Sequence, residues 1–354
     1  IKRIGGMDLE VKDTLPSPDI YRYRNKAQYP VGENKTKIIT GFYAANSHRI
    51  TECDDCLLGS EKNTEILNAV KSFMHKNSVS AYNEENGTGI VRHILIRENN
   101  AGSVMLCLVV NQRSFKHKNE LIAEISHIKE ITSVHINYNM MRNNVILGEK
   151  TEHIFGNKTI TDTIGELKFQ ISPLSFFQVN KKQVFNLYSA ALEFANISKD
   201  QTVIDAYCGT GTIGICAAAA ARTLGLSPQV TGVEQVSGAV GRARRNARAN
   251  DLAESSRFVC ADATAWMSEQ ARATFDAVIL DPPRAGSTPE FLHGLARLSP
   301  ELIVYVSCNP TTQVRDLAIL REGGYRTRRI TPVDLFPHTK HIETVCLLTR
   351  AHSR

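Results

Sequence analysis

The chain has 354 residues, with 42 Lys and Arg against 36 Asp and Glu and a formal net charge of +6. This length exceeds what one hydrophobic core usually supports, so we expect two domains, at residues 1–170 and 171–354. The 42% hydrophobic share excludes a disordered, collagen-like or coiled-coil chain. No apolar run is long enough to span a membrane, and the first residues lack the apolar stretch of a secretory signal. Because the eight cysteines are spread through a large chain, we expect no disulfide framework and a cytoplasmic location.

The first 170 residues show a mixed pattern of strands and helix. Residues 89–97 and 103–111 are typical of two strands around Asn99-Asn100-Ala101-Gly102, a sequence with the composition of a hairpin turn. A polar, helix-compatible stretch follows at 118–129, and an apolar strand at 131–138. This order predicts a small α+β domain.

From about residue 176 the rhythm of the sequence changes. Asn180 and Gln183 have the spacing of a capping box, and apolar residues then recur at helical spacing. The strand-like runs beyond them are Thr202–Ala206, Gln229–Glu234, 257–260, 275–281, 301–307 and 344–349. Most are separated by helix-length segments, which predicts a mostly parallel sheet covered on both faces. Ligands of such sheets bind beyond the carboxyl ends of the strands.

The ends of the first three runs suit a nucleoside ligand. The first run leads from Asp205 into Tyr207-Cys208-Gly209-Thr210-Gly211-Thr212, a glycine turn that lets backbone amides approach a ligand. The third glycine of the dinucleotide fingerprint and the lysine of the phosphate loop are both missing, which disfavours phosphate. Glu234 can accept hydrogen bonds from a ribose diol, and Asp262 can accept one from an adenine amino group. Each feature alone is more often an ordinary strand end, but together they indicate S-adenosylmethionine.

The fourth run ends in Asp281-Pro282-Pro283-Arg284. Two prolines fix the backbone and remove amide donors, which makes either a rigid lip of a site or a tight structural turn. Methyltransferases that act on exocyclic amines carry an aromatic residue after the prolines, where this chain has Arg284. The sequence therefore argues against methylation of an amino group.

Two further residues suit nucleophilic chemistry at a pyrimidine. Cys308 follows the fifth run, and Asn309-Pro310 then turns the chain. Cysteine is more often a small buried hydrophobe, but at this edge a thiol can be exposed and have a lowered pKa. A thiolate that adds to C6 of a pyrimidine makes C5 able to attack an electrophilic methyl group. Glu343, before the last run, can then remove the C5 proton, although a glutamate there is usually just solvated.

At these residues the chain closely resembles the bacterial RNA uracil-C5 methyltransferases, which make 5-methyluridine in tRNA and 23S rRNA. The shared signatures are residues 175–180, 205–212, 281–284, 307–311 and 341–343. The resemblance implies a class I S-adenosylmethionine-dependent methyltransferase domain, Rossmann-like with a mostly parallel sheet, preceded by a smaller α+β RNA-recognition domain. It implies Cys308 as nucleophile and Glu343 as base.

The resemblance also assigns residues to ligands. It implies that Gln178, Tyr207, Thr212, Glu234, Asp262 and Asp281 surround S-adenosyl-L-methionine. Asp205, Gly209 and Gly211 of the glycine turn complete this predicted cofactor site, and Phe176 is implied to lie near a flipped uracil. Residues 23–32, 41–43 and 47–48 are similar to the central domain of the family.

Two features of the family are not matched. Members commonly begin with a small β-barrel RNA-binding domain, and many follow it with four cysteines that hold an iron–sulfur cluster. The chain starts after both, so we expect either a naturally short protein or a fragment. Cys53-x-x-Cys56 has the spacing of half a metal site, but no second pair lies nearby. We expect neither a metal ion nor a cluster.

RNA contacts are predicted at Arg22, Arg24 and Lys26. In a strand these cations would share one face, with Tyr21 and Tyr23 on the other. The cations could follow a phosphate backbone and the rings could stack on bases. The alternative is a solvated face over a tyrosine core contact.

The target and two competing functions stay open at this point. Residues 25–28 look more like the branch of the family that modifies rRNA, so 23S rRNA is the expected target and a tRNA T-loop uridine the alternative. Cytosine-C5 methylation also uses a thiolate, but those enzymes carry Pro-Cys where this chain has Asp281-Pro282-Pro283. A non-catalytic RNA-binding or RNA-folding protein is the alternative of another class, and the presence of both Cys308 and Glu343 argues against it. We expect a monomer.

Overall fold

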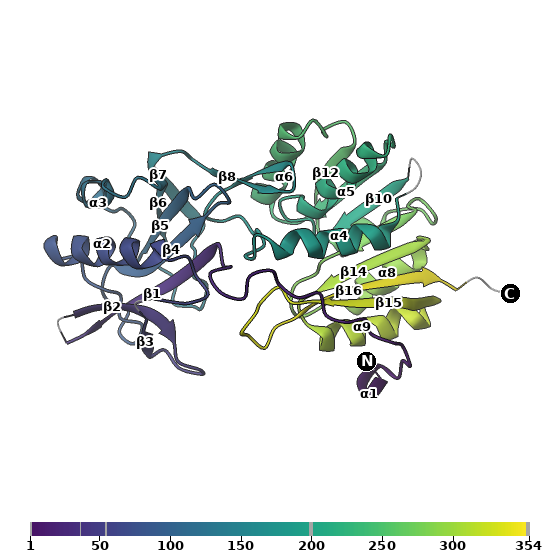
Figure 1. Ribbon diagram of the computed structural model, residues 1–354, viewed down its shortest axis with the longest axis horizontal. Coiled ribbons are helices and arrows are strands. Elements are labelled where there is room, and N and C mark those ends of the chain that lie inside the picture. Colours follow the sequence, from purple (N-terminus) through teal and green to yellow (C-terminus); the bar gives the residue numbers. More distant parts are fainter. Residues whose placement is uncertain (1, 36, 54, 198–200, 352–354) are drawn as a thin grey trace. The chain divides into compact units, whose positions relative to one another are not determined.

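The computed structural model describes residues 2–35, 37–53, 55–197 and 201–351 (Figure 1). The chain forms two compact units. Unit 1 comprises Ile1–Ile20, Ile164–Phe169 and Ser175–Arg354, and unit 2 comprises Tyr21–Thr163 and Gln170–Leu174. No helix in the described part of the chain is long and apolar enough to cross a membrane.

Unit 2 is built on a seven-stranded sheet with the order β3-β2-β1-β4-β5-β6-β7. Its elements are β1 (Lys26–Asn34), β2 (Lys37–Tyr43), β3 (Ile50–Glu52), α2 (Lys62–Lys76), β4 (Val91–Glu98), β5 (Val104–Val110), α3 (Lys118–Ile125), β6 (Ile131–Tyr138) and β7 (Lys150–Gly156). Neighbouring strands are antiparallel except β5 and β6. A two-stranded hairpin, β8 (Ile160–Ile164) and β9 (Leu167–Ile171), follows.

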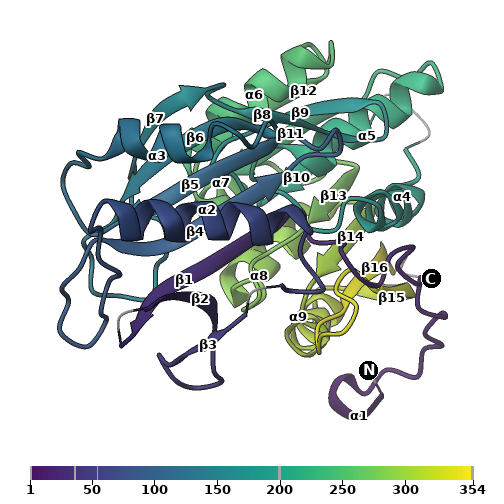
Figure 2. The same ribbon diagram turned by 60° about the vertical axis from the view of Figure 1, so that its left-hand side comes forward.

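Alternation along the strands places the core of unit 2 on one face of its sheet. Ile94 and Ile96 of β4 pack with Leu106 of β5 against apolar residues of α2 and α3, which cover this face (Figure 2). The predicted hairpin is confirmed, with the amide of Asn99 donating to the carbonyl of Ser103 at 3.0 Å. The α+β character expected of this region is also confirmed.

The predicted alternation of residues 21–26 is wrong. Tyr21 to Asn25 form a bend with one isolated bridge, and the strand begins only at Lys26. Arg22 has a left-handed backbone with φ of 53°, which an extended strand excludes. The two tyrosines therefore differ: Tyr23 is buried and Tyr21 is exposed.

Unit 1 contains a seven-stranded sheet with the order β12-β11-β10-β13-β14-β16-β15. Its elements are α1 (Lys2–Gly5), α4 (Gln183–Ala195), β10 (Thr202–Ala206), α5 (Thr212–Thr223), β11 (Gln229–Glu234), α6 (Ser237–Ala249), β12 (Ser256–Cys260), α7 (Ala263–Ser268), β13 (Ala277–Leu280), α8 (Pro289–Leu298), β14 (Leu302–Ser307), α9 (Pro310–Glu322), β15 (Tyr325–Val333) and β16 (Glu343–Arg350). Strands β12 to β14 are parallel, and β16 and β15 complete the sheet in antiparallel fashion. Helices α4, α5 and α6 pack in one layer and α7, α8 and α9 in another, so the predicted doubly covered, mostly parallel sheet is confirmed.

The predicted division at residue 170 differs from the observed one. Residues 1–20 belong to unit 1, because β15 is an edge strand whose free backbone groups they meet. The amide of Lys12 donates to the carbonyl of Ile330 at 3.2 Å, and that of Leu15 to the carbonyl of Pro332 at 2.9 Å. Leu15 forms a parallel bridge with Val333. A single bridged position leaves no strand pattern to detect in the sequence.

The capping box at Asn180 forms only in part. The side-chain oxygen of Asn180 accepts from the amide of Gln183 at 3.1 Å, as predicted. Gln183 does not complete the box: its side-chain oxygen accepts from the side-chain amide of Asn186 at 2.8 Å, and its own side-chain amide donates to the carbonyl of Leu15 at 2.8 Å. The residue that would close the cap instead ties α4 to the N-terminal segment.

Candidate active site

The register of two strands brings Cys308 and Glu343 close together. β14 and β16 are antiparallel, and their last paired residues are Ser307 and Thr344. Cys308 and Glu343 are the residues next to this last pair, and the carboxyl group of Glu343 is close enough to act on the thiol of Cys308. The two residues predicted to carry the chemistry therefore meet at the end of the sheet where the parallel strands finish.

Cys308 is half-buried, and its thiol lies in an acidic environment. Burial raises the pKa of this thiol, and the carboxyl groups of Glu343 and Asp281 raise it further. In the described part of the chain, Arg284 is the one side chain that acts on Cys308 in the opposite direction. The predicted lowering of the thiol pKa is therefore wrong for this arrangement of residues.

Glu343 is a buried carboxyl group with an unused hydrogen-bonding position. Its side chain is 3% exposed, and Oε2 has no hydrogen-bond partner among the described residues. Burial raises the pKa of Glu343, and the nearby carboxyl group of Asp281 raises it further. Burial also raises the pKa of Asp281. Two neighbouring carboxyl groups with raised pKa values can hold or accept a proton near neutral pH.

The glycine turn after β10 is shaped by left-handed backbone angles. Gly209 and Gly211 have φ angles of +54° and +79°, and a Cβ on Gly211 would lie 2.8 Å from the Phe258 ring. The amide of Gly209 donates to the Glu234 carboxylate at 3.1 Å, and the amide of Val236 donates to its other oxygen at 2.8 Å. Glu234 is partly exposed, so its remaining lone pairs can accept from a ligand.

Asp205 is a buried residue that fixes the start of the helix after the glycine turn. Its side chain is 1% exposed and accepts from the amide of Gly214, in the first turn of α5, at 2.8 Å. Burial raises the pKa of Asp205 to about 7, with smaller contributions from the carboxyl groups of Asp281 and Glu234. Asp205 therefore holds the helix that follows the turn.

Three other predicted cofactor residues lie around the same strand ends. Tyr207 has a left-handed φ of 62°, an uncommon conformation for a non-glycine residue that marks a constrained site. The hydroxyl groups of Thr212 and Tyr188 are hydrogen-bonded at 3.0 Å. Asp262 is exposed and caps α7, accepting from the amide of Ala265 at 2.9 Å, which leaves its second oxygen available.

The segment of residues 175–180 lies against the glycine turn. The hydroxyl of Thr210 donates to the carbonyl of Phe176 at 3.4 Å. The ring of Phe176 is 67% exposed, whereas Gln178 is buried. An exposed aromatic ring beside this turn offers a surface on which a flat base can stack.

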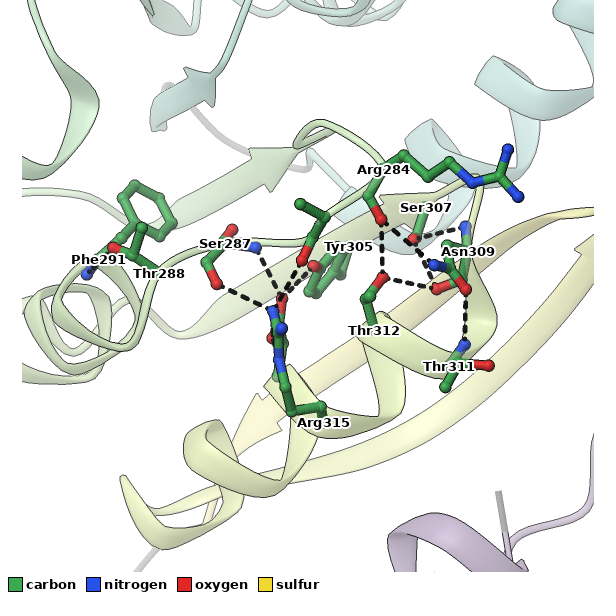
Figure 3. Close-up of polar contacts among 12 residues, drawn as sticks. Arg284, Ser287, Thr288, Phe291, Tyr305, Ser307, Asn309, Thr311, Thr312 and Arg315 are labelled. Carbon is green, nitrogen blue, oxygen red and sulfur yellow. Dashed lines mark hydrogen bonds and ion pairs between the residues drawn. The ribbon is translucent and has the colours of Figure 1, made fainter. Parts of the chain in front are cut away.

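The loop that carries Asp281 and Arg284 is tied to the loop of Cys308. Figure 3 shows the side-chain amide of Asn309 and the hydroxyl of Thr312 converging on the carbonyl of Arg284, at 3.3 and 3.2 Å. The guanidinium group of Arg284 points away from these contacts and is exposed. The backbone of this loop is therefore fixed while its cation stays available.

Two buried residues of α9, neither of them among the predicted site residues, organise this region. Asp316 accepts from the hydroxyl of Tyr305 at 2.6 Å and from the amide of Ser287 at 2.8 Å, and it forms an ion pair with Arg315. Gln313 donates to the carbonyl of Tyr305 at 2.9 Å and accepts from Thr344 at 2.7 Å. Polar residues three positions apart on a helix that packs on a sheet are the signal that would have revealed them.

The predicted RNA contacts in unit 2 have different surroundings. Arg22 forms a two-pronged ion pair with Asp55 at 2.6 and 2.7 Å and also donates to two backbone carbonyls. Burial lowers the pKa of Lys26 to about 8, and the positive charges of Arg97 and Arg24 lower it further. Arg22 thus stabilises its own loop. Lys26, Arg24 and Arg97 instead form a group of positive charges that repel one another.

The described residues contain no group of three His, Cys, Asp or Glu side chains able to hold a metal ion. Cys53 and Cys56 are both half-buried free thiols.

In comparisons with known proteins, the chain is similar to RNA methyltransferases. The family model of tRNA (uracil-5-)-methyltransferases matches residues 16–351. An uncharacterized RNA methyltransferase of Clostridium tetani is 40% identical over 98% of this chain and 75% of its own length. An uncharacterized RNA methyltransferase of Halalkalibacterium halodurans is 42% identical over 98% of this chain and 76% of its own length.

A solved structure extends the similarity to both units. The crystal structure of Pyrococcus abyssi tRNA (uracil-54, C5)-methyltransferase, in complex with S-adenosyl-L-homocysteine, has a TM-score of 0.80 and 30% identity. The similarity covers 98% of this chain and 80% of that one.

Proposed function

The chain belongs to the tRNA (uracil-5-)-methyltransferase family, and from this premise we propose that it methylates C5 of a uridine in RNA, with Cys308 as nucleophile and Glu343 as base. The observation that carries the proposal is that Cys308 and Glu343 directly follow and precede the last paired residues of β14 and β16, close enough for the Glu343 carboxyl group to act on the thiol. A thiol near a buried carboxyl group with a free oxygen is the pair that addition at C6 and proton removal at C5 require.

S-adenosyl-L-methionine is the proposed methyl donor. The turn at Gly209 and the carboxylate of Glu234 suit its ribose, and the free oxygen of Asp262 suits its adenine amino group. Its sulfonium cation suits a region where Asp205, Asp281 and Glu343 all have raised pKa values, because a positive charge favours ionised carboxyl groups. When bound, it supplies an electrophilic methyl group. The similar Pyrococcus abyssi structure holds the demethylated form of this compound.

The residues of the chain act on the uracil ring in three steps. The sulfur of Cys308, after loss of its proton, bonds to C6, and the electron pair of the C5–C6 double bond moves to C5. C5 would then bond to the methyl group as the bond between that group and the sulfonium sulfur breaks, which would leave the demethylated donor as a neutral thioether. Glu343 then takes the proton from C5. The electron pair left behind restores the double bond and expels the sulfur of Cys308. A uridine buried in folded RNA must first be unstacked, at about a few kcal/mol, and Phe176 offers its ring to the displaced base.

Replacing the nucleophile tests the first step. Cys308→Ala is expected to abolish transfer of tritiated methyl groups from S-adenosylmethionine to bulk rRNA and tRNA, because no group remains to add to C6. Binding of S-adenosylmethionine, measured by calorimetry, should persist. Cys53→Ala, the same change at a half-buried cysteine of unit 2, is the control and should retain transfer. Unchanged turnover in Cys308→Ala would rule out the mechanism.

Replacing the base tests the last step. Glu343→Gln should accumulate a covalent adduct between protein and RNA, because the C5 proton cannot leave and the sulfur cannot be expelled. The adduct appears as a shifted band on a denaturing gel. The double variant with Cys308→Ala should give no such band, and a band that persists in it would show that the bond is not to Cys308.

For the target we propose 23S rRNA, on the resemblance of residues 25–28 to the rRNA-modifying branch. A tRNA uridine is the second candidate, favoured by the substrate named for the Pyrococcus abyssi protein. Mapping 5-methyluridine in both RNAs from cells with and without the gene decides between them. Loss of the modification from tRNA alone would overturn the rRNA assignment. Loss from neither RNA, with no transfer in vitro, would favour a non-catalytic RNA-binding protein.

A further inference from the structure

Unit 2 contains a cavity of about 910 Å³ that the proposed reaction does not use. Its walls come from β1, β2, the start of β3, the segment at residues 81–85 and β4. Side chains that matter for its chemistry are Tyr43, His48, Arg49, Tyr82, Glu84 and Arg92. All lie within unit 2, whereas Cys308 and Glu343 lie within unit 1. The volume is in the range of pockets that enclose a small organic group.

One carboxylate fixes two rings on the wall of this cavity. The hydroxyl of Tyr43 donates to Oε1 of Glu84 at 2.8 Å, and Nδ1 of His48 lies 2.5 Å from Oε2. The two rings meet edge to face, with centroids 6.1 Å apart. Tyr43 is 38% exposed, so part of its fixed ring remains open. A ring held in advance loses little conformational freedom when a flat ligand stacks on it.

Another part of the wall, at Arg92 and Tyr82, is fixed as well. The guanidinium group of Arg92 lies 4.6 Å from the centre of the Tyr82 ring and donates to the carbonyls of Asn139 and Met141 at 3.0 and 2.7 Å. Both hydrogen bonds come from Nη1, and they fix the plane of the guanidinium group as part of the wall.

Charge decides which part of a nucleotide suits the interior. Glu33, Glu84 and Glu85 line the cavity and supply acceptor oxygens, while Arg49 is an exposed cation on its lining. Carboxylates repel a phosphate group, but they accept hydrogen bonds from the exocyclic amino groups of adenine, cytosine and guanine. Uracil has no such group, so this chemistry differs from that expected for the methylated base.

We propose that this cavity binds a second unpaired nucleotide of the substrate RNA, whose base carries an exocyclic amino group. The base stacks on Tyr43, its amino group meets the carboxylates, and Arg49 contacts its phosphate. The proposal rests on the proposed RNA-methylating function and adds a site for RNA recognition to it.

Substitution of Tyr43 tests the stacking. Tyr43→Ala is expected to raise KM for RNA by about tenfold or more with kcat unchanged, because base stacking in unit 2 is lost while the reacting residues of unit 1 are intact. Tyr43→Phe keeps the ring and loses only the bond to Glu84, so its KM should rise less. Phe155→Ala, at an exposed aromatic residue of β7 outside the cavity, is the matched control and should keep the wild-type KM.

Ultraviolet cross-linking of the wild-type protein to bulk rRNA and tRNA, followed by mass spectrometry, tests the position directly. The expected adduct joins Tyr43 or His48 to adenosine, cytidine or guanosine. Unchanged KM in both Tyr43 variants and no adduct at the cavity, with methyl transfer intact, would overturn this inference and leave the proposed function standing. An adduct to uridine alone would overturn the base preference. A wild-type protein that methylates no RNA would overturn both proposals.

Discussion

The thiol of Cys308 is surrounded by acids, which sets how its reactivity depends on pH. Because burial and the carboxyl groups of Glu343 and Asp281 raise the pKa of the thiol, only a small fraction is thiolate at neutral pH. The proposed nucleophile therefore depends on a change in its surroundings to ionise. A sulfonium cation beside these carboxyl groups would oppose their effect, so methyl-donor binding and thiol ionisation should be linked.

Alkylation of Cys308 by iodoacetamide should therefore need a higher pH than alkylation of an ordinary cysteine. The rate, followed by mass spectrometry from pH 6 to 10, reports the thiolate fraction, and exposed Cys260 serves as the reference in the same digest. Glu343→Gln removes one negative neighbour, so it should shift the Cys308 profile to lower pH. If the alkylation rate of Cys308 rose at a lower pH than that of Cys260, the inferred effect of the acidic neighbours on the thiol would be contradicted.

The alternation of strands and helices in residues 202–349 can be predicted from the sequence, because each buried strand is an apolar run. The ends of β10, β11, β13 and β14 followed from it, which brought the predicted site residues to one edge of the sheet. β15 was missed, since its residues 326–329 are polar or charged and it has no apolar run before Ile330. The bend at residues 21–25 and the packing of residues 1–20 on unit 1 cannot be predicted in this way. Both depend on backbone hydrogen bonds to residues that are distant in the sequence.

The helix α9 acts as a platform for the two loops of the proposed site. Its buried Asp316 holds the amide of Ser287 and the hydroxyl of Tyr305, and its first turn holds the carbonyl of Arg284. Gly286 turns the chain between them with φ of +81°. A Cβ there would lie 2.6 Å from both Arg315 and Asp316, so the close approach requires glycine.

Gly286→Ala should consequently displace the loop of Asp281 and Arg284. We expect a loss of about 1–3 kcal/mol in the free energy of unfolding and a fall in kcat for methyl transfer. Denaturant melts and the tritiated-methyl assay measure the two effects. Gly294→Ala is the matched control, since it lies inside α8 with no atom within 4 Å of the new Cβ and should stabilise the fold by about 0.5–1 kcal/mol. Normal stability and kcat in Gly286→Ala would refute the platform role of α9.

The net charge of +6 is only a small excess of 42 Lys and Arg over 36 Asp and Glu for a protein that binds a polyanion. Several of these cations are used internally, as Arg22 is by Asp55 and Arg315 is by Asp316. The sequence shows the number of charges but not their pairing, because partners such as Arg22 and Asp55 lie 33 residues apart. For the same reason the cavity at Tyr43 could not be predicted, since its walls come from separate segments.

RNA binding should therefore depend on salt through a small number of contacts. If about three phosphates are neutralised, raising KCl from about 50 to 200 mM should weaken binding to single-stranded RNA roughly 20-fold. Lys26→Gln should flatten the plot of log affinity against log salt by about 0.7, because one contact is lost. Since burial and neighbouring cations lower the pKa of Lys26 to about 8, the wild-type slope should also flatten between pH 7 and 9, and the variant should lack this change. Filter binding measures these slopes; equal slopes for wild type and variant at pH 7 would remove Lys26 from the RNA contacts.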